Sequence, residues 1–237
     1  MRDIRAVLFD LDDTLHDDTL AFTSAAEEVA REVAAEHGID ALELKAAYVA
    51  EAEGFWHRLD RDQVRERISH LREAFWASAL ERVGLTDPML AQTSAANYHA
   101  YRNKYFALFP GALDLLRDLK SRGVKLGMVT NGFSETHRDK LIVLQISELF
   151  DALFLPDETG MVKPDPLLFA HACRELGVAP KHSAMVGDRY ERDIAGAQQA
   201  GLMTVWVNVR GEPVPDGGKP PDANVERIDQ VAAVLFP

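Results

Sequence analysis

The chain has 237 residues, an apolar fraction of 47% and a formal net charge of −12. This length allows a core domain with a smaller second domain, and the acidic surface argues against a nucleic-acid polymer or an anionic membrane as partner. The single cysteine, Cys173, excludes an intrachain disulfide and is typical of a reducing compartment. No stretch predicts a signal peptide or a membrane span, so we expect a cytoplasmic protein.

The first predicted element is a buried strand at residues 4–9. Its sequence, Ile-Arg-Ala-Val-Leu-Phe, is mostly apolar, as in parallel strands that are covered on both faces. Two aspartates, Asp10 and Asp12, follow it almost at once. Like charges this close are unfavourable unless something positive lies among them. The end of this strand therefore predicts a charged site.

Residues 17–106 are predicted to form a four-helix insertion. The segments here are rich in Ala and Glu with helical spacing, and Gly38 ends the first of them. Asp40 and Asp87 are expected N-caps, with Pro88 at a first helical position. Most of the aromatic residues are expected to form the insertion's own core, and polar neighbours of these aromatics are candidates for contact with a substrate. The aromatics are Phe55, Trp56, Phe75, Trp76, Tyr98, Tyr101, Tyr105 and Phe106, and the polar neighbours are His57, Arg58 and His99.

From residue 107 onward, predicted strands and helices alternate. This alternation predicts an α/β domain with a parallel sheet, so the expected domains are residues 1–16 with 107–237, and residues 17–106. Strands are expected at 124–129, 152–155, 183–186 and 203–207, helices from 134, over 165–176 and over 225–236, and a loop at 210–221.

Polar residues follow each of the inner strands of this predicted sheet. Thr130 and Asn131 follow the second strand, Lys163 precedes the helix over 165–176, and Asp188 and Asp193 follow the fourth strand. In doubly wound sheets, ligands bind at the carboxyl ends of the strands. We therefore expect these side chains to converge with the aspartates that follow the first strand.

The converging residue types suit phosphoryl chemistry. Carboxylates suit Mg²⁺, a hydroxyl with amides at a helix start suits a phosphate, and a lysine can neutralise both. Each residue also has an ordinary structural interpretation: Thr130 as a helix cap, Lys163 as a solvated loop lysine, and Asp193 as a favourable charge in a first helical turn. The order and placement of all of them favour an aspartate that attacks phosphorus.

In this order, the segments DLDDTL, VTNG, KPDP and GDRYERD resemble the four motifs of the haloacid dehalogenase superfamily. The helical insertion directly after the first motif resembles the helical-cap branch of that superfamily. The resemblance implies an α/β fold with a Rossmann-like three-layer core around a parallel sheet, plus an inserted four-helix cap.

The resemblance also implies catalytic roles. Asp10 would be the nucleophile that forms an aspartyl-phosphate, and Asp12 the general acid and base. Thr130, Asn131 and Lys163 would hold the phosphoryl group.

A magnesium ion is implied as well. Its ligands would be the side chain of Asp10, the backbone carbonyl of Asp12 and the side chain of Asp188, with Asp193 supporting through water. The halide-removing members of the superfamily lack the acid/base aspartate and need no metal, so Asp12 points to a phosphatase. Asp13 stands where Gly or Asn is commoner, and we interpret it as an exposed turn residue.

Other interpretations remain open at this point. They are a phosphosugar mutase, a 2-haloacid dehalogenase and a non-enzymatic phosphoacceptor module, although such a module carries no large helical insertion. The core most resembles pyrimidine 5′-nucleotidases and N-acylneuraminate-9-phosphatases, with phosphoglycolate phosphatases as close relatives. This implies a small phosphorylated metabolite as substrate, either a nucleoside monophosphate or a sugar phosphate, and a monomer or homodimer.

Overall fold

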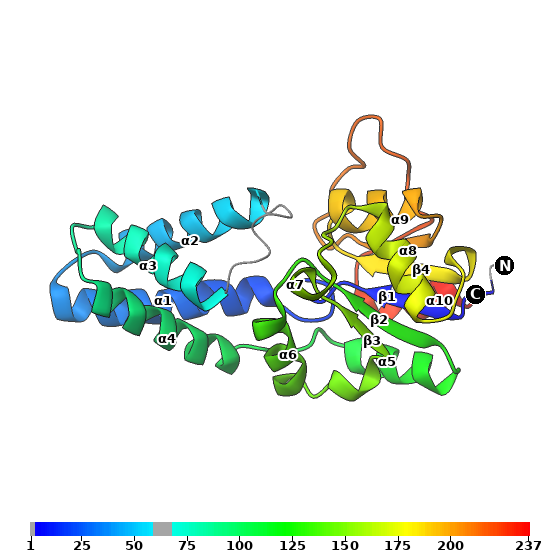
Figure 1. Cartoon of the computed structure of the whole chain (residues 1–237), viewed down its shortest axis with the longest axis horizontal. Helices are drawn as coiled ribbons and strands as arrows, with labels where there is room; N and C mark the ends of the chain where they lie inside the picture. Colours follow the sequence, from blue (N-terminus) through cyan, green and yellow to red (C-terminus); the bar gives the residue numbers. More distant parts are fainter. Residues whose placement is uncertain (1–2, 59–67) are drawn as a thin grey trace. The chain divides into compact units, whose positions relative to one another are not determined.

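The structure is a computed structural model that describes residues 3–58 and 68–237. The chain divides into two compact units, Met1–Asp17 with Ala107–Pro237 and Asp18–Phe106. We call the first the α/β unit and the second the helical unit, as their ribbons in Figure 1 indicate. The sequence prediction had placed the first boundary after residue 16.

The α/β unit is built on a parallel sheet. Within the described part of the chain, six strands lie in the order β3-β2-β1-β4-β5-β6, and every neighbouring pair is parallel. The α/β prediction is thereby confirmed. The strands are β1 (Ala6–Phe9), β2 (Lys125–Val129), β3 (Ala152–Phe154), β4 (Ser183–Gly187), β5 (Met203–Val207) and β6 (Ala223–Val225).

The C-terminal segment departs from the prediction. The helix expected over residues 225–236 is instead the end of β6, a 3₁₀ turn at Ile228–Gln230 and the short helix α10 (Val231–Leu235). The strand was missed because three residues, Ala-Asn-Val, carry too little alternation to be recognised. Its pairing with β5 is what makes it a strand.

Strand β1 lies inside the sheet, between β2 and β4, and all four of its residues are buried. The chain leaves β1 for β2 and β3 on one side and then crosses to β4 on the other side. The strand order therefore reverses beside β1, which is the position where open α/β sheets bind ligands. Asp10 follows directly at the carboxyl end of β1.

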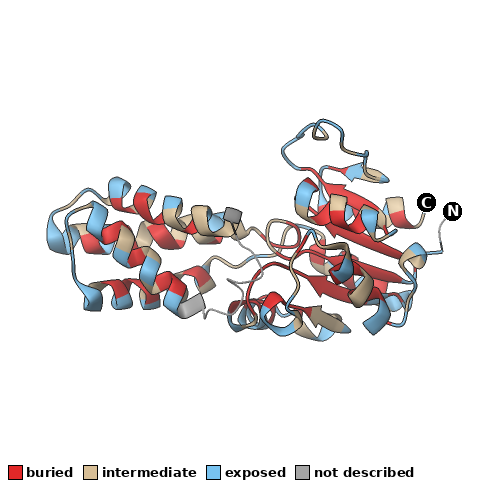
Figure 2. Ribbon diagram, turned by 45° about the horizontal axis from the view of Figure 1, so that its top comes forward, coloured by how far each residue is buried: buried red, intermediate tan, exposed pale blue. Residues whose placement is uncertain are grey.

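Helices cover both faces of the sheet, as Figure 1 shows. On one face, α8 (Pro166–Glu175) packs against α9 (Ala195–Gln199), and their buried side chains join the sheet in one apolar cluster. On the opposite face, α5 (Ala112–Ser121) packs against α10. Helix α6 (Ser134–Val143) follows β2, and the short α7 (Pro156–Thr159) follows β3. In Figure 2 the strands are almost wholly buried.

In its described residues, the helical unit consists of α1 (Asp18–His37), α2 (Ala41–Arg58), α3 (Ile68–Arg82) and α4 (Pro88–Lys104). The expected caps are confirmed. Asp40 accepts hydrogen bonds from the first backbone amides of α2, and Asp87 does the same for α4. Gly38 has φ +68° where α1 ends. The N-terminal part of the third predicted helix lies outside the described residues. No helix in the described ranges is long and apolar enough to cross a bilayer.

Aromatic residues form the centre of the helical unit. Tyr48, Trp76 and Tyr98 are buried in one cluster, and the rings of Tyr48 and Trp76 stack with centroids 4.1 Å apart. Phe75 and Tyr101 pack against this cluster, and Tyr101 and Tyr105 donate hydrogen bonds to glutamates of α1. The prediction of an aromatic core is therefore correct for Trp76 and Tyr98 and, at the edge of the cluster, for Phe75 and Tyr101, while Tyr48 was not foreseen.

The helical unit contains the three polar residues that the sequence predicts as candidates for contact with a substrate. The side chains of His57 and Arg58 lie outside the described residues. Nδ1 of His99 lies 3.1 Å from the guanidinium of Arg72, and both side chains belong to the helical unit. Arg72 itself is buried and lies over the ring of Tyr98.

Candidate active site

Lys163 connects two carboxylates at the end of β1. Its Nζ lies 2.8 Å from Oδ1 of Asp10 and 2.7 Å from Oδ1 of Asp193. All three side chains are buried. Asp10 continues the sheet, because its backbone N–H donates to the carbonyl of Val186 in β4. Lys163 is therefore not the solvated loop lysine of its alternative interpretation.

Asp188 completes a cluster of three carboxylates. One oxygen each from Asp10, Asp188 and Asp193 lies within 4.8 Å of the others. Asp193 stands in a π-helical turn, Tyr190–Ile194, and its Oδ2 accepts the backbone N–H of Arg189 at 2.9 Å. The structure thus brings Asp10, Asp188 and Asp193 together, as the sequence predicts.

A glycine allows this cluster to close. A Cβ placed on Gly187, the last residue of β4, would lie 2.4 Å from Cγ of Asp193. No side chain can approach a carboxylate so closely. The absence of a side chain at Gly187 is thus what lets Asp193 reach Lys163.

The cluster carries more negative than positive charge. Burial raises the pKa of Asp10 to about 7, against the opposing effect of Lys163, and burial with neighbouring carboxylates raises the pKa of Asp188 to about 8. Burial would lower the pKa of Lys163, but Asp10 and Asp193 outweigh it and raise that pKa. Lys163 pairs with Asp10 and Asp193, and Nε of Arg189 lies 3.2 Å from Oδ2 of Asp188. Two basic groups thus face three acidic ones, an arrangement that favours an additional cation.

Thr130 and Asn131 lie where β2 ends, and both are buried. Oγ1 of Thr130 accepts the backbone N–H of Gly132 at 3.1 Å. The amide side chain of Asn131 binds the backbone of Lys163 twice: Nδ2 donates to its carbonyl at 3.0 Å, and Oδ1 accepts its N–H at 2.7 Å. Asn131 therefore fixes the segment that carries the lysine, a role that the sequence did not predict.

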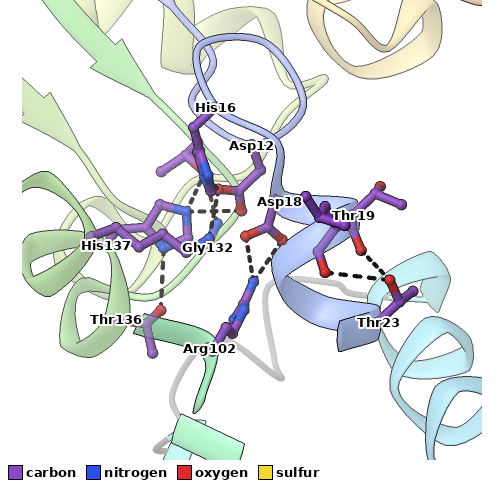
Figure 3. A network of polar contacts seen from close by, with 12 residues as sticks. Asp12, His16, Asp18, Thr19, Thr23, Arg102, Gly132, Thr136 and His137 are labelled. Atoms are coloured by element: carbon purple, nitrogen blue, oxygen red, sulfur yellow. Dashed lines mark hydrogen bonds and ion pairs between the residues drawn. The ribbon is translucent and has the colours of Figure 1, made fainter. Parts of the chain in front are cut away.

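The carboxylate of Asp12 has different neighbours. Its Oδ1 lies 2.6 Å from Nζ of Lys140 and 2.8 Å from Nε2 of His16, and its Oδ2 lies 3.3 Å from Nε2 of His137. Figure 3 shows both imidazoles directed at this carboxylate. Burial would raise the pKa of Asp12, but Lys140 and the two histidines outweigh it and hold that pKa well below its usual range.

Sequence reasoning missed these three neighbours of Asp12. A faint signal was present, because His137 and Lys140 stand three residues apart on the helix that follows Thr130 and so share a face. His16 stands four residues after Asp12. Nothing in the local pattern shows that this face is buried.

Asp13 has a left-handed backbone with φ +58°. This is the conformation that glycine and asparagine adopt most easily, and aspartate tolerates it among the other residues. The greater frequency of glycine and asparagine at this motif position therefore has a conformational reason. Asp13 lies in a turn as predicted, but it is half-buried where full exposure was expected.

Comparisons with known proteins agree with this geometry. Residues 4–201 match the family model described as haloacid dehalogenase-like hydrolase. The glyceraldehyde 3-phosphate phosphatase of Methanothermobacter thermautotrophicus is 33% identical over 86% of each chain. The N-acylneuraminate-9-phosphatase of Mus musculus is 32% identical over 98% of this chain and 94% of its own length. A solved structure described as the 2-haloacid dehalogenase of Pseudomonas syringae pv. Tomato DC3000 superposes with a TM-score of 0.70, at 30% identity over 98% of each chain.

The chain belongs to the haloacid dehalogenase-like hydrolase family. Within that family its curated relatives are phosphatases, N-acylneuraminate-9-phosphatase among them. The protein is accordingly an enzyme of the phosphoric monoester hydrolase class.

Proposed function

We propose that this protein is a Mg²⁺-dependent phosphatase of small phosphorylated metabolites that works through a phosphorylated Asp10. The observation that carries the proposal is the buried Lys163 between Asp10 and Asp193, with Asp188 completing the carboxylate cluster. A nucleophile, a cation for the phosphoryl group and a set of metal ligands thus share one strand end.

The donor set fits Mg²⁺. It offers hard oxygen ligands in a small volume, where burial and neighbouring carboxylates raise the pKa values of Asp10 and Asp188, and a bound cation would offset both effects. Asp10, Asp188 and the backbone carbonyl of Asp12 would bind the ion directly. Asp193 would act through water, because its two oxygens already accept from Lys163 and Arg189. When bound, the ion would neutralise charge between the nucleophile and the phosphoryl oxygens.

In the first step, a carboxylate oxygen of Asp10 attacks phosphorus and the bond from phosphorus to the ester oxygen breaks. Asp12 gives a proton to the departing alkoxide, and the negative charge of the bound phosphoryl group would raise its low pKa toward the protonated form that this step needs. In the second step, Asp12 takes a proton from water as the water oxygen bonds to phosphorus. The bond from phosphorus to Asp10 then breaks and inorganic phosphate leaves. Lys163 and Thr130 would hold the phosphoryl oxygens throughout, with Asn131 keeping Lys163 in place.

The names of the relatives support a substrate class. Glyceraldehyde 3-phosphate and N-acylneuraminate 9-phosphate, the substrates in two of their names, both carry phosphate on a primary alcohol carbon. We propose the same ester type here, in a sugar phosphate or a nucleoside monophosphate. A primary alkoxide is a poor leaving group, so its departure would need the proton that Asp12 donates. The helical unit would serve as a cap that selects among such esters.

The other activities receive less support. A 2-haloacid dehalogenase has no alkoxide to protonate, so the elaborate environment of Asp12 would have no use in it. A phosphosugar mutase would use the same first step and differ in its product. Product analysis with a phosphosugar separates a mutase from a hydrolase.

The test is phosphate release from a panel of phosphorylated metabolites, with p-nitrophenyl phosphate as reference. Activity should vanish after treatment with EDTA and return with added Mg²⁺. Primary phosphate esters should rank above secondary ones. Full activity of a metal-free sample would contradict the metal assignment, and activity on none of the esters would contradict the proposed function.

A further inference from the structure

Three nearly buried side chains surround the carboxylate of Asp12. Lys140 is 1% exposed, His16 and His137 are equally inaccessible, and all three reach Asp12 from within the α/β unit. The side chain of Asp12 itself remains 31% exposed. The donors therefore hold its inner part, and the outer part stays open to a reacting molecule.

The fold gains little from burying Lys140. Removing a lysine ammonium from water is costly unless it is paired, and a buried ion pair adds little net stability compared with apolar side chains of the same volume. An apolar residue at this position of α6 would serve packing as well. The lysine is better explained by what it does to Asp12.

His137 connects Asp12 to Thr130. Its Nε2 lies 3.3 Å from Oδ2 of Asp12 and 3.1 Å from Oγ1 of Thr130. Oγ1 of Thr136 lies 3.2 Å from Nδ1 of the same ring and fixes its orientation, as Figure 3 shows. The ring packs against the backbone of Gly132, where a Cβ would lie 1.6 Å from Cε1 of His137.

We propose that His137 and Lys140 are positioning residues of the reaction, which deepens the proposed function and rests on the acid/base role of Asp12. Together they hold both carboxylate oxygens of Asp12 and so keep the carboxylate apart from the Asp10–Asp188–Asp193 cluster. The carboxylate is then aimed at the ester oxygen. Through His137, its position is tied to the residue that holds the phosphoryl group.

The first test compares leaving groups. Lys140→Met keeps the volume of the side chain and removes the charge. It should lower kcat/KM, which reports the first step, for a primary alkyl phosphate by about 10- to 100-fold, as expected for a misplaced acid, and lower kcat/KM for p-nitrophenyl phosphate only a few-fold. The melting temperature should fall, because the substitution removes one partner of the buried ion pair and leaves Asp12. An equal loss for both esters, or no loss for the alkyl ester, would overturn the proposal.

Two variants of His137 keep the test decisive if Lys140→Met does not fold. His137→Gln retains a donor near the position of Nε2, and His137→Leu does not. We expect His137→Gln to keep most of the activity on the alkyl phosphate and His137→Leu to lose it selectively. Equal behaviour of the two variants would count against a positioning role.

A double-mutant cycle separates this inference from the proposed function. If Lys140 acts through Asp12, adding Lys140→Met to Asp12→Asn should cost no further activity on the alkyl phosphate, and additive losses would overturn the inference. Wild-type activity of Asp12→Asn on both esters would instead overturn the proposed role of Asp12. The two failures are therefore distinguishable.

Discussion

Asp10 and Asp12 stand two residues apart at the end of β1, and their carboxyl groups have opposite surroundings. Asp10 shares Lys163 with Asp193, and burial raises its pKa to about 7. Asp12 contacts a lysine and two histidines, and its pKa lies well below the usual range. The same residue type is thus prepared for two different tasks by its neighbours.

The difference shows what balances the negative charge of each of the two aspartates. The Asp10 cluster holds more acidic than basic groups, so it favours a metal ion, and under the proposed function it would hold a phosphoryl group with that ion's help. The charge of Asp12 is already balanced by the protein, so its carboxylate does not compete for the metal. Five substitutions or conditions can break or sharpen this contrast.

The largest effect should come from Asp10→Asn. This change keeps the shape of the side chain and removes the nucleophile, so turnover of every ester should fall below detection. Asp13→Asn is the matched control, because it removes the same charge three residues away at a position with φ +58° that asparagine tolerates. Activity near wild type is expected for the control. Measurable turnover by Asp10→Asn would assign the nucleophile elsewhere.

Asp12→Asn should produce the second largest effect, and a selective one. Loss of acid/base catalysis should lower kcat for a primary alkyl phosphate by about 10²–10⁴-fold. With p-nitrophenyl phosphate the first step needs little acid, so the variant should release one equivalent of p-nitrophenol in a burst and accumulate phosphorylated enzyme. Mass spectrometry of the quenched protein measures this species. A steady rate equal to that of the wild type would mean that Asp12 assists neither step.

Much of this arrangement could be predicted from sequence, and the boundary of the prediction has a physical cause. Asp10, Lys163 and Asp188 follow or precede apolar strands, and parallel topology brings the carboxyl ends of strands to one edge whatever the details. A short-range pattern and one topological rule were therefore enough to place them. The caps Asp40 and Asp87 were equally predictable, because capping is a local interaction.

The neighbours of Asp12 could not be predicted in this way. Lys140 stands in the segment ETHRDKL, which is as polar as a solvated helix, and its burial depends on how α6 packs against the loop after β1. The left-handed turn at Asp13 and the pairing of β6 with β5 likewise depend on the completed sheet. Each of these features depends on tertiary packing, which the local sequence pattern does not predict.

Two glycines should give intermediate effects that differ between the clusters. In Gly187→Ala, the new Cβ would meet Asp193, including its Cβ at 2.5 Å, so we expect about 1–3 kcal/mol of lost stability and reduced activity on all esters alike. In Gly132→Ala, the new Cβ would clash with the ring of His137. The activity of this variant should fall mainly on alkyl phosphates. Thermal melts and two-substrate kinetics measure both, and identical profiles would mean that the clusters are not functionally separate.

The smallest effect is a pH dependence of stability in the metal-free protein. Asp10 and Asp188 have folded pKa values of about 7 and about 8, above the unfolded value of about 4. A carboxyl with a raised folded pKa contributes stability that is complete below its unfolded pKa and is lost as the pH rises through the folded pKa. The metal-free protein should therefore lose stability between about pH 4 and about pH 8, relative to Asp188→Asn.

Added Mg²⁺ competes with protons for these oxygens, so its stabilising effect should grow over the same range. Each kcal/mol corresponds to about 2–4 °C in melting temperature for a chain of this size. Melting curves with and without Mg²⁺ at several pH values measure the trend. A magnesium-induced shift that is equal at both ends of the range, or larger in acid, would show that the Asp10 cluster already carries its negative charge without a cation, as Asp12 does.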